Sequence, residues 1–210
     1  MVLTSTINAQ GVYYRMVNRQ IRELAMKGEK AITVENVLGQ RYIGGGLHNN
    51  AVITIHGTPG QDLGAFMNGP RIVVHGNAQD GVGNTMNNGA IVIHGKAGEI
   101  PGHSMRGGII IIRDDAEYRA GIHMKEYEDQ IPLIVIGGTV KDYCGEYMAG
   151  GRMVVLNRLD DSYPAGNDVG TGIHGGVIYI RGNVDSRRLG VGAVFDTLND
   201  DDKNFLQQAI

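Results

Sequence analysis

Short apolar runs recur along the chain, and within each run the apolar residues occupy every second position. Four runs begin near residues 52, 71, 90 and 109, so the interval is 19 residues. One face of the runs holds Ile53 and Ile55, Ile72 and Val74, Ile91 and Ile93, and Ile110 and Ile112. In the first run, Thr54 and His56 occupy the other face. Because side chains of a strand alternate between two faces, each run predicts one short β-strand with a single buried side.

Glycine and methionine also occupy fixed places in the repeat. The columns are Gly57, Gly76 and Gly95; Gly64, Gly83, Gly102 and Gly121; and Met67, Met86, Met105 and Met124. Upstream, Gly45 falls in the second glycine column and His48 in the methionine column at the same interval. After a break, Gly138, Gly145 and Met148 repeat the spacing. We interpret the glycines as corners that need positive φ or lack side-chain room, and the methionines as inward-pointing fillers of the core.

Every repeat reads in the same direction, which favours stacked parallel strands over hairpins. The sequence therefore predicts an all-β fold, a right-handed parallel β-helix of about seven coils in a single domain, residues 1–210. Residues 1–30 are expected to form an N-terminal cap with a helix near 16–28, and residues 31–195 the solenoid. Residues 196–210 are expected to form a C-terminal helix that caps the other end of the stack. Loops at 114–132 and 157–172 break the period and are candidates for partner contacts.

Composition narrows the possible functions. Glycine accounts for 33 of 210 residues, the net charge is −3, and the pI is near 6.1. This balance gives no bulk attraction to nucleic acid or anionic membranes. The one cysteine, Cys144, excludes an internal disulfide. The N-terminus lacks signal-peptide character and no apolar run is long enough to span a membrane, so a cytoplasmic location is expected.

The segment "GHSMRG" at 102–107 resembles the start of a G-x-S-x-G nucleophile elbow, with Ser104 at its tip. The second glycine is replaced by Arg106, and Gly102 and Met105 already belong to the repeat columns. An elbow also requires a following helix, which the repeat does not predict. Ser104 is therefore interpreted as a coil corner, and an independent esterase using Ser104 is the weaker alternative.

The histidines are the other candidates for a functional site. His56, His75 and His94 would stack about 5 Å apart on successive strands. They could hold a metal, but Arg113 ends the series, so an exterior ladder is preferred. His123 and His174 lie in "GIH" triplets and are interpreted as coil corners, and Cys144 as a small buried residue. No catalytic, cofactor-binding or metal residues are assigned.

Three stretches together resemble a known family: "GTPGQDLGAFMNGPRIVVHGNAQDGVGNTMNNGAIVIHG", "GIHMKEY" and "GEYMAGGRMVVL". They are similar to the C-terminal GXGXG β-helix domain of the glutamate synthase large subunit, in a free-standing, archaeal-type version. The formylmethanofuran dehydrogenase subunit that shares these repeats is a more distant relative. The resemblance implies a structural domain without catalytic residues, whose FMN and iron–sulfur cluster lie on partner chains.

Function is therefore expected at the level of a complex. The resemblance implies a non-catalytic scaffold for making glutamate from glutamine and 2-oxoglutarate, with an FMN synthase subunit and a glutamine amidotransferase subunit as partners. A component like the repeat-containing subunit of formylmethanofuran dehydrogenase is an alternative. Self-association through an exposed flank of the solenoid stays open.

Overall fold

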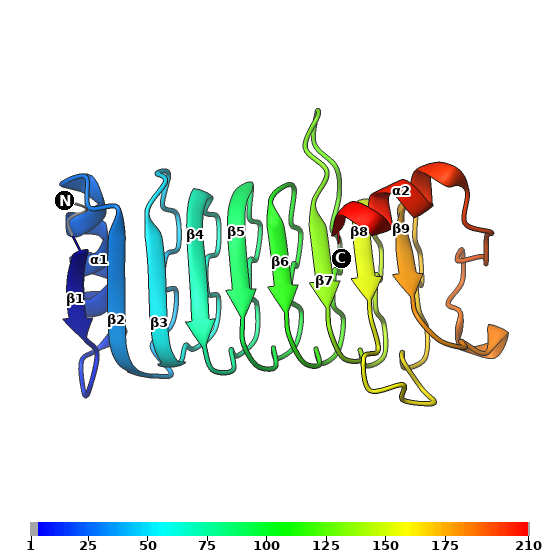
Figure 1. Cartoon of the computed structure of the whole chain (residues 1–210), viewed down its shortest axis with the longest axis horizontal. Coiled ribbons are helices and arrows are strands. Elements are labelled where there is room, and N and C mark those ends of the chain that lie inside the picture. The colour runs from blue at the N-terminus through cyan, green and yellow to red at the C-terminus, as the bar shows by residue number, and fades with distance from the viewer. Residues whose placement is uncertain (1–3, 210) are drawn as a thin grey trace.

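The computed structural model describes residues 4–209 and consists of one stack of parallel strands with a helix in each end region (Figure 1). The strands follow one another in the sheet in chain order. They are β1 (Thr4–Asn8), β2 (Ala31–Leu38), β3 (Val52–Thr58), β4 (Asn68–His75), β5 (Asn88–Ile93), β6 (Ile109–Ile112), β7 (Leu133–Ile136), β8 (Ala149–Val155) and β9 (Gly175–Ile180). The helices are α1 (Tyr14–Met26) and α2 (Asp200–Ala209), and η1 (Ser186–Arg188) is a short 3-10 turn. The predicted parallel β-helix is confirmed.

The register of the sheet reproduces the predicted columns. Ile53 pairs with Ile72, Ile72 with Ile91, and Ile91 with Ile110, each 19 positions on. Ile110 pairs with Ile134, 24 positions on, because the coil between β6 and β7 carries an insertion that rises above the stack (Figure 1). The loop at 157–172 lengthens the coil between β8 and its partner β9 in the same way. The inserted residues thus leave the stacking intact.

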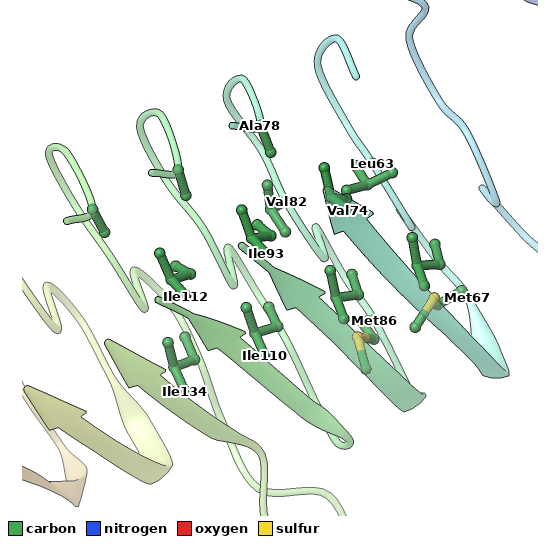
Figure 2. Packing of buried hydrophobic residues seen from close by; sticks show 14 of the residues in the cluster. Leu63, Met67, Val74, Ala78, Val82, Met86, Ile93, Ile110, Ile112 and Ile134 are labelled. Carbon is green, nitrogen blue, oxygen red and sulfur yellow. The ribbon is translucent and has the colours of Figure 1, made fainter. Parts of the chain in front are cut away.

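Stacked aliphatic side chains fill the interior between the sheet and the returning half of each coil (Figure 2). The inward isoleucines of β3 to β6 are fully buried, and so are Met67, Met86, Met105, Met124 and Met148. The inward positions and the methionine columns are therefore confirmed as core. Each such side chain contributes about 1.5–3 kcal/mol by leaving water. The core consequently runs without interruption from α1 to β9.

The returning half of each coil has a distinctive backbone. Every second residue there has positive φ, as in Asp62 (60°), Gly64 (66°) and Phe66 (58°). The next coils repeat this at residues 81, 83 and 85, at 100, 102 and 104, at 119, 121 and 123, and at 143, 145 and 147. We call these three positions the first, middle and third left-handed columns. Left-handed backbone is costly for residues with a Cβ, so the architecture itself explains much of the glycine content.

Hydrogen bonds from these segments point both ways along the stack. The Asp62 and Phe66 N–H groups donate to Asp80 O and Asn84 O of the following coil, at 2.9 and 2.8 Å. The Gly64 N–H instead donates to Ile43 O of the preceding coil, at 2.8 Å. The return side of the solenoid is therefore linked from coil to coil just as the sheet side is, which satisfies its buried backbone groups.

The middle column requires glycine for space as well as for φ. A Cβ on Gly102 would lie 2.3 Å from Ile134 Cδ1, and one on Gly83 would lie 2.5 Å from Ile110 Cδ1. The upstream member of this column is Gly44, whose Cβ would meet Ile72 Cδ1 at 2.6 Å. The prediction that Gly45 and His48 continue the columns is therefore wrong by one residue. Leu47, which is 6% exposed, takes the methionine position.

The N-terminal end is closed by both a strand and a helix. β1 pairs with β2 although no repeat signal predicted a strand there. The predicted helix is confirmed as α1, which buries Val17, Ile21 and Ala25 against the core. On its other edge, Asn18 Nδ2 donates to Arg41 O at 2.8 Å. α1 thus replaces the return segment of the first coil.

The C-terminal helix is present as predicted, but it lies on the outer face of the sheet. Phe205 and Leu206 of α2 pack over Val135, Val154 and Tyr179, which point outward from β7, β8 and β9. The Tyr179 hydroxyl donates to Asp202 Oδ1 at 2.7 Å. Burial and this carboxylate raise the pKa of Tyr179 to about 12. α2 therefore covers a flank of the last three strands.

We predict that Gly102→Ala destabilises the protein by about 2–4 kcal/mol, because a methyl group is forced into left-handed backbone and against Ile134. The measurement is the urea midpoint followed by circular dichroism. Ser104→Gly is the matched control two residues away, in an outward left-handed position, and should change stability by no more than about 1 kcal/mol. Equal midpoints for wild type and Gly102→Ala would contradict the proposed packing.

Candidate functional site

The outward side chains of the return segments bring polar residues from several coils together. Asn84 Nδ2 donates to Asp62 Oδ1 at 3.0 Å, and Asn84 Oδ1 lies 3.2 Å from His103 Nδ1. The His103 ring meets the His123 ring edge-on at 6.1 Å, and His123 stacks on Tyr147 at 5.3 Å. This row of five side chains crosses successive coils and is the strongest candidate for a polar site on the return side.

The surroundings of His103 lower its pKa. Burial lowers its pKa first, because a charged imidazole is poorly solvated there, and the nearby His123 lowers it further. The Asp62 carboxylate acts in the opposite direction. His103 is therefore held in its neutral form over a wider pH range than an exposed histidine, and can accept or donate a hydrogen bond there.

An ion pair between a buried carboxylate and an exposed guanidinium adjoins the same row. Glu146, 8% exposed, has Oε2 at 3.4 Å from Arg119 Nε, and the Arg119 guanidinium lies 5.2 Å from the centre of the Tyr143 ring. Neither this pair nor the row of five was identified from the sequence. The signal was available in principle, because Asn84 and His103 are 19 residues apart and therefore occupy one column of adjacent coils.

Ser104 occupies the third left-handed column, with φ of 53°. Phe66, Thr85, His123 and Tyr147 share the conformation at the equivalent places, so the backbone of Ser104 belongs to the repeat. The segment is a turn whose next strand is β6, and no helix follows it. Within residues 4–209, the hydrogen bonds of the structure include none from the Ser104 hydroxyl to a histidine. The geometry of a nucleophile elbow is not assembled here.

The predicted histidine ladder is formed on the outer side of the sheet. His56 and His75 stack at 4.8 Å with 9° between their planes, and His75 and His94 at 5.1 Å with 1°. Glu35 lies at the start of the ladder, 3.8 Å from His56 Nε2. Parallel rings direct their nitrogens side by side, whereas metal ligands must converge on one point. Among the described residues, no group of three or more His, Cys, Asp or Glu is placed to hold a metal ion.

The other two singled-out histidines lie in different columns. His123 belongs to the third left-handed column. The His174 N–H donates to Met148 O, as the Lys125 N–H does to Met105 O, so His174 occupies the position after the methionine. The shared "GIH" triplet therefore does not mark equivalent corners.

Cys144 is confirmed as a buried residue. It is fully enclosed, and its place between Tyr143 and Gly145 corresponds to that of Leu63, between Asp62 and Gly64. Burial raises the pKa of its thiol to about 12. Because the thiolate is the reactive form, Cys144 is chemically inert at neutral pH.

A shallow polar hollow is present where the 157–172 loop departs from the stack. It is lined by Tyr163, Asn167, Asn183 and Arg188, among others. Arg188 lies over the Tyr163 ring at 4.5 Å, and Arg187 pairs with Asp185. Its charged groups are thus already satisfied within the chain.

Residues 18–193, which contain all the complete coils, match the family described as GXGXG motif. The chain belongs to the GXGXG motif family. It is also 50% identical, over 207 aligned positions, to an uncharacterised protein of Methanocaldococcus jannaschii. The match covers 93% of this chain and 78% of that relative. In this GXGXG protein, two glycines separated by one residue both adopt left-handed backbone at Gly44 and Gly46, at Gly81 and Gly83, and at Gly170 and Gly172.

We predict that the pKa of His103 lies below 6.5 and responds to its neighbours with opposite signs. His123→Gln should raise the pKa of His103, and Asp62→Asn should lower it. The measurement is the pH titration of the imidazole proton shifts by NMR. Because the folded-state pKa is depressed, the unfolded chain binds the proton more tightly, and His103 should destabilise the fold as the pH falls below about 6.5. Shifts of the same sign in both variants would contradict the assignment.

We also predict that Cys144 does not react with a disulfide reagent such as dithionitrobenzoate at pH 8, where its thiol is protonated and enclosed. Addition of urea should release one thiol per chain. Rapid reaction of the folded protein would show that this part of the core opens readily.

Proposed function

We propose that this GXGXG protein is a non-catalytic scaffold subunit of a glutamate synthase-like complex. Support comes first from the family membership, together with the sequence runs that resemble the glutamate synthase domain. The observation that carries the proposal is that the residues of the repeat have structural roles. Glycine, methionine and isoleucine columns serve packing and turns, and the repeat leaves Ser104 in an ordinary coil position.

The proposed chemistry takes place on partner chains. A glutamine amidotransferase subunit releases ammonia, and a synthase subunit with FMN and an iron–sulfur cluster adds it to 2-oxoglutarate with reduction. The solenoid holds the two partners in a fixed relation. A rigid core that is continuous along the stack suits this role, because it resists bending between two attachment points.

A cytoplasmic location is part of this proposal. Within residues 4–209, no helix is both long and apolar enough to cross a lipid bilayer. The formal charge of −3 also favours no polyanionic partner.

The test is purification of the tagged chain from its native cells under mild conditions. A flavoprotein and an amidotransferase should co-elute, with flavin absorbance near 450 nm, and the eluate should form glutamate from glutamine and 2-oxoglutarate. Deletion of the chain should abolish the assembly. Re-expression of wild type and of Ser104→Ala should restore it equally.

Other outcomes discriminate between the candidates. Tungsten or molybdenum in the eluate, with formylmethanofuran oxidation, would replace this proposal by a formylmethanofuran dehydrogenase component. Ester hydrolysis by the isolated chain that is lost in Ser104→Ala would replace it by a hydrolase. A chain that elutes alone, with glutamate synthesis unchanged in the deletion strain, would refute it.

A further inference from the structure

The outer face of the sheet continues beyond the part that α2 covers. Its central column is Thr6, Thr33, Thr54, Val73, Val92, Ile111, Val135, Val154 and Tyr179. α2 buries the last three members. The aliphatic character begins three strands earlier, at Val73, and these strands have no helix over them (Figure 1). Ile109 and Ile111 are each 40% exposed.

We infer that the outer face of β4 to β6, which we call the open strip, binds an acidic amphipathic α-helix of a partner protein, laid beside α2 on the same sheet. The proposal deepens the scaffold function by assigning the surface on which a partner is held, and it depends on that function only in requiring a partner chain.

The contacts that α2 makes with the outer face of β7 to β9 indicate which kind of helix the open strip would bind. Three residues on one side of α2 make the contacts. The Asp202 carboxylate accepts a hydrogen bond from Tyr179, and Phe205 and Leu206, one helical turn later, pack on the aliphatic column. The Arg152 guanidinium lies 4.2 Å from the centre of the Phe205 ring. The surface thus accepts a helix through an acidic residue followed by apolar residues at i+3 and i+4.

The open strip repeats the aliphatic column and the arginine, whereas Val73, Val92 and Ile111 offer no hydroxyl like that of Tyr179. Arg71 lies in the same outward row as Arg152, through Ala90, Ile109 and Leu133. Arg71 is exposed and makes no ion pair in the described structure, so its guanidinium is free to meet an aromatic ring or a carboxylate. A helix of the α2 type therefore finds both an apolar column and a cationic partner on β4.

Charge favours an acidic occupant. The outward positions of β3 to β6 and of the residue after each strand contain no Asp or Glu. On one side the strip is bordered by His75, His94 and Arg113, the last of which is already paired with Asp114. On the other side it is bordered by Arg71, which supplies the positive charge. α2 itself begins with Asp200, Asp201 and Asp202. Complementary charge would orient a similar helix and exclude basic ones.

Two elements that break the repeat delimit the strip. The C-terminal end of α2 lies by β7, and the insertion between β6 and β7 rises beside it (Figure 1). That insertion is closed by a bridge between Tyr127 and Gln130, and it exposes Tyr127 (51%) and Ile131 (49%). A helix on the open strip would meet apolar side chains at the edge of the sheet as well as on its face.

The experiment places the photo-cross-linker p-benzoylphenylalanine at position 92 of the full chain in its native cells, and at position 66 as the control on the return side. Irradiation followed by mass spectrometry identifies the attached peptide. We expect position 92 to capture a partner segment that is acidic and carries apolar residues at i, i+3 and i+4.

Variants test the chemistry of the strip. Ile111→Glu and Arg71→Glu should each lower the cross-linking yield at position 92 at least about tenfold, since loss of a central contact commonly has this effect. Phe66→Asp adds a negative charge to an exposed apolar position of the return side and should leave the yield unchanged. Circular dichroism and urea midpoints confirm that all three variants fold, and a variant that fails to fold is replaced by Ile109→Glu.

The inference is overturned if position 92 captures a second copy of this chain, a basic or extended segment, or nothing while position 66 captures a partner. The experiment can reject the helix-binding inference and the scaffold role independently. Co-purification of the flavoprotein with an empty strip rejects the inference alone, and an acidic helix from a protein outside any glutamate-forming assembly rejects the scaffold role alone.

Discussion

The contact between one glycine of each coil and an aliphatic side chain of the opposite layer fixes the thickness of the solenoid. Gly102 faces Ile134 Cδ1, and Gly145 faces Ile178 Cδ1, in each case on the second strand that follows. A larger residue would push the return segment away from the sheet at that coil. The left-handed φ and the close approach are both met only by glycine, so a single residue type satisfies two constraints.

This constraint separates the residues that hold the fold from those that are free to differ. In the first and third left-handed columns the side chains point outward, and glycine, aspartate, tyrosine, serine and histidine all occur there. These positions retain some backbone strain, which the hydrogen bonds to the neighbouring coils offset. Asp62, His123 and Tyr147 of the polar row occupy such positions, which suits a surface that has to match partners.

Much of the architecture could be predicted from the sequence, because stacking requires equivalent residues to recur at one interval. Alternation at Ile53 and Ile55, and the methionine column, were sufficient to predict parallel strands and an inward face. The interval fails at the first coils: Gly44 precedes Gly64 by 20 residues instead of 19, so the regular spacing placed Gly45 and His48 one residue too late. β1 has no repeat at all because α1 intervenes before β2.

The candidate site and the position of α2 were less accessible to prediction. Amphipathicity indicates that a helix has a buried side, but not which surface receives it, so α2 was expected at the end of the stack and lies on its flank. The row containing Asn84 and His103 depends on knowing which return residues face outward. The 19-residue spacing aligns these two positions but does not give the side on which their side chains lie.

The two-way hydrogen bonding of the return segments gives every coil the same upper and lower edge. A whole coil is consequently interchangeable with its neighbours, and the stack can gain or lose one without a new kind of junction. Length then changes in steps of about 4.8 Å, the distance between adjacent strands. In such a protein, the number of coils between two binding surfaces sets the distance between the molecules bound there.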